Sequence, residues 1–241
     1  MIYDKICLFC PTYGRSKTYL PKFVESAEKN SNGICFSFCV NGKDVDTLKY
    51  ITERKWKFPY EIIMEDLSKP HLAKYYNMIY NLSKWKPEKE TVVSMVGDDM
   101  QFLTPNWDIK ILELINHYKG IGVFWANDDY IARERLCVNM FVTRDFVEAT
   151  EHDFMCELFA AEMIDYLWHK VGKYTRTLHF DPDIHIKHDH QYSYPTKDDT
   201  FNRLQPLRDA AWIGGKLKAK EIASKIAEIL KKKGMVGKSV C

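Results

Sequence analysis

The stretch Val92-Val-Ser-Met-Val-Gly-Asp-Asp-Met-Gln-Phe102 joins an apolar run to two adjacent carboxylates, Asp98 and Asp99. Residues 91–96 have the composition of a buried strand, and Gly97 ends the run. Two neighbouring carboxylates repel each other unless a cation lies beside them. The stretch therefore has two interpretations, either an acidic turn in solvent or a site for a divalent metal.

The chain around this stretch alternates between strand-like and helix-like segments. The hydrophobic periodicity predicts strands at residues 5–10, 34–40, 60–64, 91–96 and 121–125, and helices at residues 19–29, 46–54, 72–82 and 107–118. Such alternation predicts an α/β fold with a mostly parallel sheet flanked by helices. Because ligands of these sheets bind beyond the carboxyl ends of the strands, we expect the turn at Pro11–Arg15 and the turn at Gly97–Met100 to lie at one edge.

The second half of the chain has a more mixed pattern. It predicts a strand at 137–143, a helix at 154–171 stopped by Gly172, short strands at 175–180 and 184–188, a polar loop at 191–203 and an amphipathic C-terminal helix at 216–233. No repeat or flexible linker divides the chain. We therefore expect one domain over residues 1–205, with halves at 1–125 and 126–205, and a helical tail over 206–241.

Composition places the chain among ordinary soluble proteins. It has 241 residues, 46% hydrophobic and 28% charged. It contains neither a long apolar run that could span a membrane nor a signal peptide, so a cytoplasmic location is expected. The odd number of cysteines, seven, favours free thiols. Cys7 and Cys10 form a C-x-x-C, but on a strand they point to opposite faces and would chelate zinc poorly.

Charge is unevenly distributed along the chain. From Lys216 onward eight lysines oppose Glu221 and Glu228, a net charge of +6, whereas the whole chain carries only +2. The preceding residues are therefore net acidic. A basic amphipathic tail is typical of contacts with nucleic acid or with an anionic membrane, although it also describes a docking helix with a solvated lysine face.

Several side chains are candidates for binding phosphate or metal. Asp98 and Asp99 offer the oxygen ligands that Mg²⁺ and Mn²⁺ prefer beside phosphates. The first turn can bind a base or a phosphate through Pro11, Thr12, Tyr13 and Arg15, although it matches neither the dinucleotide motif nor the P-loop.

Two further groups of residues extend this set. Lys74 and Asn77 lie three apart on one expected helix face, where they can reach a diphosphate or simply be solvated. In His185-Ile-Lys-His188-Asp-His190, alternation places His188 and His190 on one face of a strand and His185 on the other. We expect His188 or His190 to complete a metal site with Asp99, and a three-histidine zinc site is the less favourable alternative.

These motifs, in this order, resemble the glycosyltransferases of the GT-A fold, and within them the small family-2-like enzymes often carried by phages. The resemblance covers about residues 5–205 and rests on Pro11–Arg15, Leu72–Asn77, Met95–Asp108, Ala126–Asp128, Asp165–Gly172 and Pro182–His190. It implies that Asp99 binds the metal, that Asp98 contacts the sugar nucleotide, and that Asp165 or Glu162 is the catalytic base. One departure is the reading G-D-D, in which Gly97 replaces the first aspartate of the D-x-D motif.

The resemblance implies a metal-dependent hexosyl- or pentosyltransferase, with Mn²⁺ or Mg²⁺ as cofactor and a nucleotide-diphosphate sugar, UDP-sugar first, as donor. An inverting reaction is expected, and a retaining reaction, which requires no base in that position, is the alternative. Together with the basic tail it suggests DNA carrying hydroxymethylated bases as acceptor. The alternatives are a lipid-linked or cell-surface glycan as acceptor, a metal-dependent nucleotidyltransferase, and a non-catalytic nucleic-acid-binding module. The last is disfavoured because no aromatic residue follows Trp212 for stacking bases.

Overall fold

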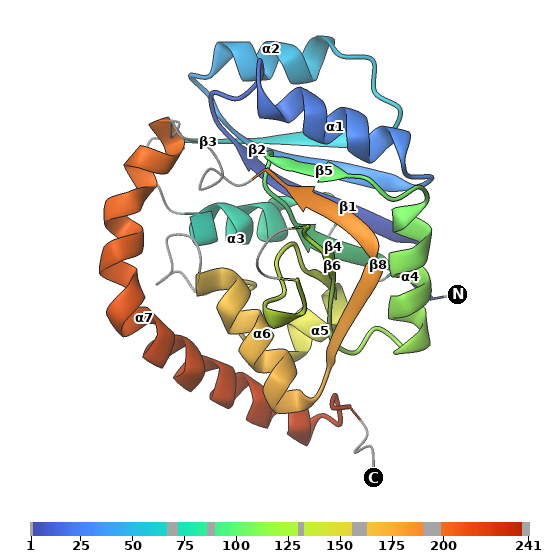
Figure 1. Ribbon diagram of the computed structural model, residues 1–241, viewed down its shortest axis with the longest axis vertical. Coiled ribbons are helices and arrows are strands. Elements are labelled where there is room, and N and C mark those ends of the chain that lie inside the picture. Colours follow the sequence, from blue (N-terminus) through green and yellow to red (C-terminus); the bar gives the residue numbers. More distant parts are fainter. Residues whose placement is uncertain are drawn as a thin grey trace.

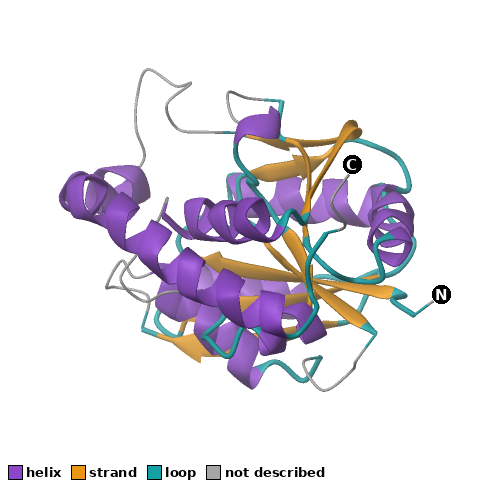
Figure 2. Cartoon of the chain, turned by 90° about the horizontal axis from the view of Figure 1, so that it is seen from below, coloured by secondary structure: helices purple, strands orange, loops and turns teal. Residues whose placement is uncertain are grey.

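An eight-stranded sheet lies at the centre of the molecule, with helices on both of its faces (Figures 1 and 2). The computed structural model describes residues 2–66, 72–85, 90–129, 133–155, 163–189 and 199–237. In sequence order the strands are β1 Lys5–Thr12, β2 Ile34–Asn41, β3 Tyr60–Glu65, β4 Thr91–Met95, β5 Met100–Phe102, β6 Val123–Asn127, β7 Phe141–Thr143 and β8 Leu178–His188.

The strands follow the order β3-β2-β1-β4-β7-β6-β8-β5 across the sheet. Pairs β1–β2, β2–β3, β1–β4 and β6–β8 are parallel, whereas β4–β7, β6–β7 and β5–β8 are antiparallel. The expected α/β fold with a mostly parallel sheet is confirmed. Since β1, β2, β3 and β4 run in one direction, their carboxyl ends meet at one edge of the sheet, as the sequence predicted.

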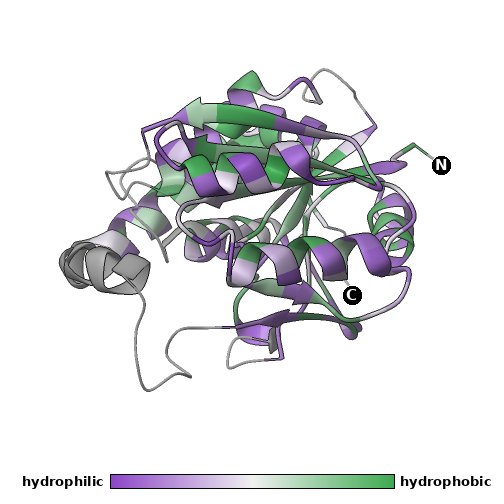
Figure 3. Ribbon diagram, turned by 90° about the horizontal axis from the view of Figure 1, so that it is seen from above, coloured by the Kyte–Doolittle hydropathy of each residue, from purple (hydrophilic) through white to green (hydrophobic). Residues whose placement is uncertain are grey.

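The helices divide between the two faces. They are α1 Tyr19–Lys29, α2 Val45–Glu53, α3 Leu72–Leu82, α4 Trp107–His117, α5 Arg144–Ala149, α6 Met163–Thr175 and α7 Asp199–Lys232, with one 3₁₀ turn at Arg133–Arg135. Helices α1 and α4 bury their apolar sides in one core, and α3, α5, α6 and α7 in the other. Figure 3 shows the hydrophobic residues concentrated in the strands and along one side of the helices.

Strand β1 shows why its residues are apolar throughout. Ile6 and Leu8 enter the core of α1 and α4, whereas Cys7 and Phe9 enter the core of α3 and α6. A strand covered on both faces has no polar side. Cys7 is fully buried on one face and Cys10 on the other, as free thiols, which confirms the expectation for this C-x-x-C.

The helix expected at 154–171 was wrong in extent. Among the described residues, helix α6 begins at Met163 and continues through Gly172 to Thr175. Gly172 is therefore not a stop signal. A Cβ at this position would lie 2.5 Å from Cδ2 of Leu178, so the glycine allows α6 to approach β8 closely.

Other boundaries also differ from expectation. The two strands expected at 175–180 and 184–188 form the single strand β8, and the strand expected at 137–143 is reduced to Phe141–Thr143. The strand β5 was not expected at all. The loop expected at 191–203 was wrong for residues 199–203, which begin α7. Helix α7 runs without interruption through the boundary that we placed at residue 206, and the division into domain and tail stays a prediction.

Helix α7 packs along α6 and is not a detached tail. Its buried side chains Ala219, Ala223, Ile226 and Leu230 belong to the same core as α3 and α6. The opposite side of the helix exposes Lys218, Lys220, Lys225, Lys231 and Lys232. In the part of the chain that the structure describes, no helix is both long and apolar enough to cross a bilayer.

Candidate active site

Asp98 and Asp99 lie at the carboxyl edge of the sheet, directly beside Arg15. Nη1 of Arg15 is 2.6 Å from Oδ1 of Asp98 and 3.5 Å from Oδ2 of Asp99. The hydroxyl of Thr12, at the end of β1, donates a 2.7 Å hydrogen bond to Oδ2 of Asp98. Asp98 is only 4% exposed, so the interpretation of this pair as an acidic turn in solvent is wrong.

His188 brings a third strand end to Asp99. Nε2 of His188 lies 3.4 Å from Oδ1 of Asp99. Two backbone hydrogen bonds hold His188 in this position. The amide of Asp189 donates to the carbonyl of Asp99 at 2.8 Å, and the amide of His188 donates to the carbonyl of Asp128 at 3.1 Å. Asp99 therefore lies between a guanidinium and an imidazole.

The charges of these four residues are strongly coupled. Burial raises the pKa of Asp98 above its usual value, although Arg15 opposes the rise. Burial also disfavours the charged form of Asp99, but His188 and Arg15 outweigh it and leave the pKa of Asp99 below its usual value. Burial lowers the pKa of His188, and the Asp99 carboxylate more than compensates, so that this pKa is raised. Asp99 is thus held ionised in a buried site, as a metal ligand must be.

Gly97 explains why the first aspartate of a D-x-D motif is missing here. A Cβ at this position would overlap Oδ1 of Asp99 and approach the side chain of Met100 to 3.5 Å. Because that same oxygen faces His188, making room for a Cβ would turn the carboxylate away from the imidazole. The glycine therefore belongs to the geometry that aims Asp99.

The side chains at this site supply only some of the ligands that a divalent cation needs. Asp99 offers carboxylate oxygens and His188 an imidazole nitrogen, both of which suit Mn²⁺. Within the described residues no cluster of three or more His, Cys, Asp or Glu side chains forms a complete metal site. A cation bound here would need further oxygens, and Mg²⁺ or Mn²⁺ beside a diphosphate takes them from phosphate and water. The residues present fit such a shared site.

The loop after β1 lies beside the two carboxylates. Tyr13 is 38% exposed, and Gly14 adopts a left-handed φ of 68°. The amide of Gly14 donates to Oδ2 of Asp44 at 2.6 Å, and Oδ1 of Asp44 caps α2 by accepting from the amide of Thr47. Arg15 also lies 5.0 Å above the Tyr19 ring, which helps to fix its guanidinium.

Polar residues at the ends of β2 and β3 were missed by the sequence analysis. Asn41 ends β2 and donates to Oδ1 of Asp66, just after β3, at 3.3 Å. Asp44 follows a few residues later. The signal that could have found them was the rule already used for Asp98, namely that every parallel strand delivers its carboxyl end to the same edge.

Lys74 and Asn77 contact different partners. Nζ of Lys74 is 3.8 Å from Oε1 of Glu65, and its side chain is half exposed. Asn77 is buried, its amide nitrogen donates to the carbonyl of Met155 at 2.8 Å, and its oxygen accepts from the amide of the same residue at 2.6 Å. Asn77 thus holds a backbone segment, and a contact to a diphosphate would cost both bonds.

Asp165 lies near the start of α6, on the side of the sheet occupied by α3. Its carbonyl accepts from the thiol of Cys137 at 3.3 Å. Burial lowers the pKa of His188 and Asp99 raises it, and the Asp165 carboxylate adds to that rise. Burial raises the pKa of Tyr76, and Asp165 adds to this rise as well. Glu162 and His190, the other candidates for base and metal ligand, lie outside the described residues.

No protein-family model matches this sequence, and no curated protein sequence is significantly similar to it. Solved structures do resemble the fold. TarS residues 1–349 of S. aureus in complex with UDP-GlcNAc superposes with a TM-score of 0.61 at 10% identity, covering 95% of this chain and 73% of that one. The mannosyltransferase PcManGT of Pyrobaculum calidifontis, in complex with GDP-Man and Mn²⁺, superposes with a TM-score of 0.56 at 9% identity, covering 97% and 76%.

The match to the UDP complex of TarS 1–349 has a TM-score of 0.58 at 11% identity and covers 76% of this chain but 59% of that chain. The chain spans 43% of the full TarS chain. These neighbours are glycosyltransferases of the GT-A type. The chain therefore has the GT-A fold, which confirms the fold that the motifs implied.

Proposed function

We propose that this chain is a metal-dependent glycosyltransferase that uses a nucleotide-diphosphate sugar, with a UDP-sugar as the first candidate donor. The observation that carries the proposal is the buried row Arg15, Asp98, Asp99 and His188 at the carboxyl edge of a GT-A sheet. The neighbours' complexes with UDP, UDP-GlcNAc and GDP-Man support the choice of donor.

Each residue of this row has a distinct task in the proposal. Tyr13 and the Pro11–Thr12 strand end line the position of the nucleotide, and Arg15 neutralises charge beside the two carboxylates. Asp98, tied to Thr12 and Arg15, faces the sugar nucleotide. Asp99 and His188 would hold Mn²⁺ or Mg²⁺, which as a bound cation would stabilise negative charge on the leaving diphosphate.

The group transfer requires a base on the acceptor side. The acceptor hydroxyl oxygen forms a bond to the anomeric carbon of the sugar, and the bond from that carbon to the phosphate oxygen breaks, with its electron pair leaving on the diphosphate. The hydroxyl proton passes to a carboxylate. We assign this role to Asp165, whose charge already reaches His188 across the site. Attack by the acceptor hydroxyl on the face opposite the leaving group inverts the configuration at the anomeric carbon.

A binding screen tests the donor assignment directly. UDP, UDP-sugars and GDP-mannose are titrated into the protein with Mn²⁺ and with EDTA, and slow hydrolysis of the bound donor is followed by product analysis. We expect binding of one nucleotide class to require Mn²⁺ and hydrolysis to release the nucleoside diphosphate. Release of sugar 1-phosphate and a nucleoside monophosphate would instead indicate attack at the α-phosphorus, as in nucleotidyl transfer.

The lysines of α7 favour a second candidate for the acceptor, DNA carrying hydroxymethylated bases. Exposed lysines bind phosphates without regard to sequence, and such binding weakens steeply with salt. Duplex DNA should then bind at low salt and dissociate as salt rises, and a Lys218→Gln/Lys225→Gln variant should bind more weakly. Binding that ignores salt would count against this candidate.

A further inference from the structure

A hydrogen-bonded pair, His185 and Asp129, lies beside the candidate site and has no task in the chemistry described above. Nδ1 of His185 is 2.7 Å from Oδ1 of Asp129. The pair is open to solvent, with 43% of the His185 side chain and 31% of the Asp129 side chain exposed. Since the carboxylate engages one ring nitrogen and fixes the ring, the other nitrogen can bond to a ligand.

An irregularity between β6 and β8 creates this pair. Ala126 is registered with Asp181, whereas the next residue, Asn127, is registered with His185. The extra residues of β8 move His185 to the end of β6, where the chain turns into Asp129. Bulges of this kind re-aim side chains and are frequent next to active sites.

The turn that carries Asp129 is tied to the metal-binding end of β8. Asp129 has a left-handed φ of 52°, and its amide donates to Oδ1 of Asn127 at 3.0 Å. The preceding residue, Asp128, accepts a hydrogen bond from the amide of His188 through its carbonyl. On the other side, the amide of His185 donates to the hydroxyl of Thr104 at 2.8 Å. The pair is therefore fixed relative to His188.

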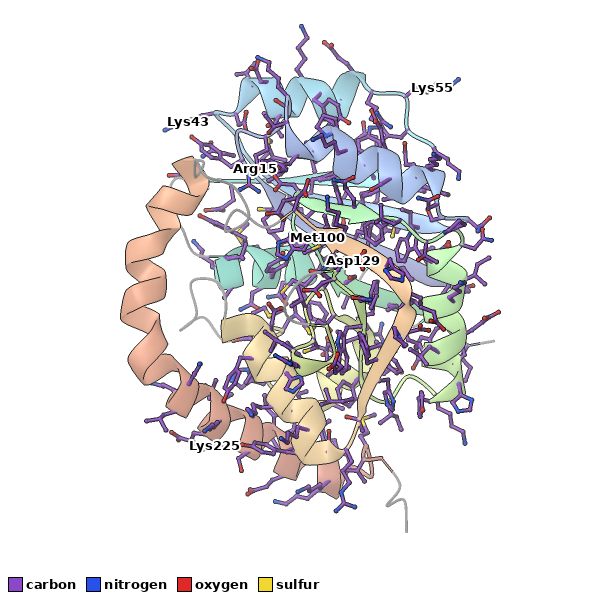
Figure 4. All side chains as sticks on the ribbon, viewed as in Figure 1. Arg15, Lys43, Lys55, Met100, Asp129 and Lys225 are labelled. Atoms are coloured by element: carbon purple, nitrogen blue, oxygen red, sulfur yellow. The ribbon has the colours of Figure 1, made fainter. Side chains whose placement is uncertain are left out.

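The spacing along β8 places the pair away from the reacting atoms. His185 and His188 are three residues apart on an extended strand, a separation of about 10 Å, and they point to opposite faces. Figure 4 shows Asp129 near Met100, the registered partner of His188, in the middle of the molecule. At that separation the pair can contact an acceptor at a group other than the hydroxyl that attacks.

The charge around the pair determines which acceptor fits. Three aspartates of the described segments 127–129 and 181–189 reach solvent, namely Asp129, Asp181 and Asp183, whereas Asp128 and Asp189 are buried. The one lysine of these segments, Lys187, has its Nζ 3.0 Å from Oδ1 of Asp189. Such a surface repels a phosphate chain. The exposed lysines of α7 lie elsewhere, and Figure 4 shows Lys225 at the lower left of the molecule, away from Asp129.

The same surface suits an uncharged ligand rich in hydroxyl groups. Gln101 of β5 and Lys187 of β8 are registered partners. Because side chains alternate along a strand, both lie on the face opposite to that of the buried Phe102 and Ile186. Amide and imidazole groups can both donate to and accept from hydroxyls, and a carboxylate accepts from them. Together with His185 these side chains form a polar face on β5 and β8.

We propose that the His185–Asp129 pair binds the acceptor, and that this acceptor is an uncharged saccharide and not DNA. The inference rests on the proposed glycosyltransferase function. The pair hydrogen-bonds a hydroxyl of the acceptor remote from the attacking one. It positions the acceptor and takes up no proton during transfer.

The test measures transfer from the UDP-sugar or GDP-mannose that binds in the screen described above. The acceptors are a panel of neutral mono- and disaccharides and duplex oligonucleotides containing hydroxymethylcytosine. His185→Gln and Asp129→Asn are compared with the unaltered protein and with Lys55→Gln, a control at an exposed lysine that Figure 4 shows at the outer edge of the molecule. We expect transfer to a saccharide, with the acceptor KM raised about tenfold in both site variants, within the range for the loss of one hydrogen bond. The Kd for the nucleotide with Mn²⁺ should stay within about twofold of the original, which also shows that the variants are folded, and Lys55→Gln should change neither quantity.

Three results would overturn the inference while leaving the proposed function in place. They are an unchanged acceptor KM in both site variants, transfer to oligonucleotides alone, and donor hydrolysis without transfer to any saccharide of the panel. Absence of nucleotide-sugar binding by the unaltered protein is a different outcome, because it removes the proposed function itself and the inference with it.

Discussion

Oδ1 of Asp99 lies 3.4 Å from Nε2 of His188, and this contact joins the loop after β4 to the end of β8. The two residues come from opposite halves of the sequence. Their strand ends meet because β5, which directly follows Asp99, pairs antiparallel with β8, so that Met100 is registered with His188. A short strand of three residues thus assembles the candidate metal site.

Replacing His188 with alanine should weaken Mn²⁺ binding about tenfold or more, because it removes one of the two proposed ligands and an adjacent positive charge that keeps Asp99 ionised. Mn²⁺ titration followed by electron paramagnetic resonance measures the effect. The matched control is His152→Ala, an exposed histidine outside the site. Equal Mn²⁺ affinities in both variants would show that His188 is not a ligand.

Replacing Gly97 with alanine should also impair metal binding, for a steric reason. The new methyl group would overlap Oδ1 of Asp99 and push the carboxylate away from His188. We expect Mn²⁺ affinity to fall about tenfold, which corresponds to about 1.4 kcal/mol of binding free energy. Gly33→Ala is the control, since a Cβ there meets nothing within 4 Å. Unchanged affinity in Gly97→Ala would mean that the carboxylate can move freely.

Gly122 is expected to matter for stability and not for binding. It has a φ of 140°, and a Cβ there would lie 2.6 Å from the carbonyl oxygen of Thr177, which is backbone and cannot turn aside. Gly122→Ala should lower the free energy of unfolding by about 2 kcal/mol, within the range for a strained backbone position. Urea denaturation compares it with Gly33→Ala, and similar midpoints for the two variants would contradict the steric account.

His179 should make stability depend on pH. Its ring stacks on Tyr118, with centroids 3.6 Å apart, and on Phe124. Burial lowers its pKa to about 4 in the folded chain, whereas an unfolded histidine titrates near about 6.5. Between these values the unfolded chain binds more protons, so this contribution is fully present above about pH 6.5 and is lost as pH falls toward 4.

The variant His179→Phe keeps the stacked ring and removes the titration. Its Tm should therefore decline less than that of the original protein as pH is lowered from about 7 to 4. Differential scanning calorimetry at several pH values gives the comparison. Parallel curves for the two proteins would show that another group controls this range.

The parts of the site that the sequence predicted are those that follow from strand order. One buried run ends at Asp98 and Asp99, and another ends near Arg15. Their carboxyl ends lie side by side because the two strands are parallel neighbours in one sheet. The helix at 72–82 was predicted with its observed bounds because its apolar residues follow helical spacing closely.

Other features depended on contacts that a single sequence does not display. Strand β5 is too short for a periodic pattern, and it forms only because β8 lies beside it. An asparagine side chain such as that of Asn77 can bind a ligand. In the structure its amide nitrogen and oxygen are both hydrogen-bonded to the backbone of Met155, which is distant in sequence. Gly172 has the residue type of a helix stop, but its place against Leu178 gives it a packing role.

The central claim is that Asp99 binds a cation that a sugar nucleotide shares. Isothermal titration calorimetry of UDP binding, in Mn²⁺ and in EDTA, tests it on the original protein and on Asp99→Asn, which keeps the shape of the side chain and removes its charge. The account predicts that Mn²⁺ strengthens UDP binding to the original protein at least about tenfold and leaves UDP binding to Asp99→Asn unchanged. Equal enhancement by Mn²⁺ in the two proteins would contradict it.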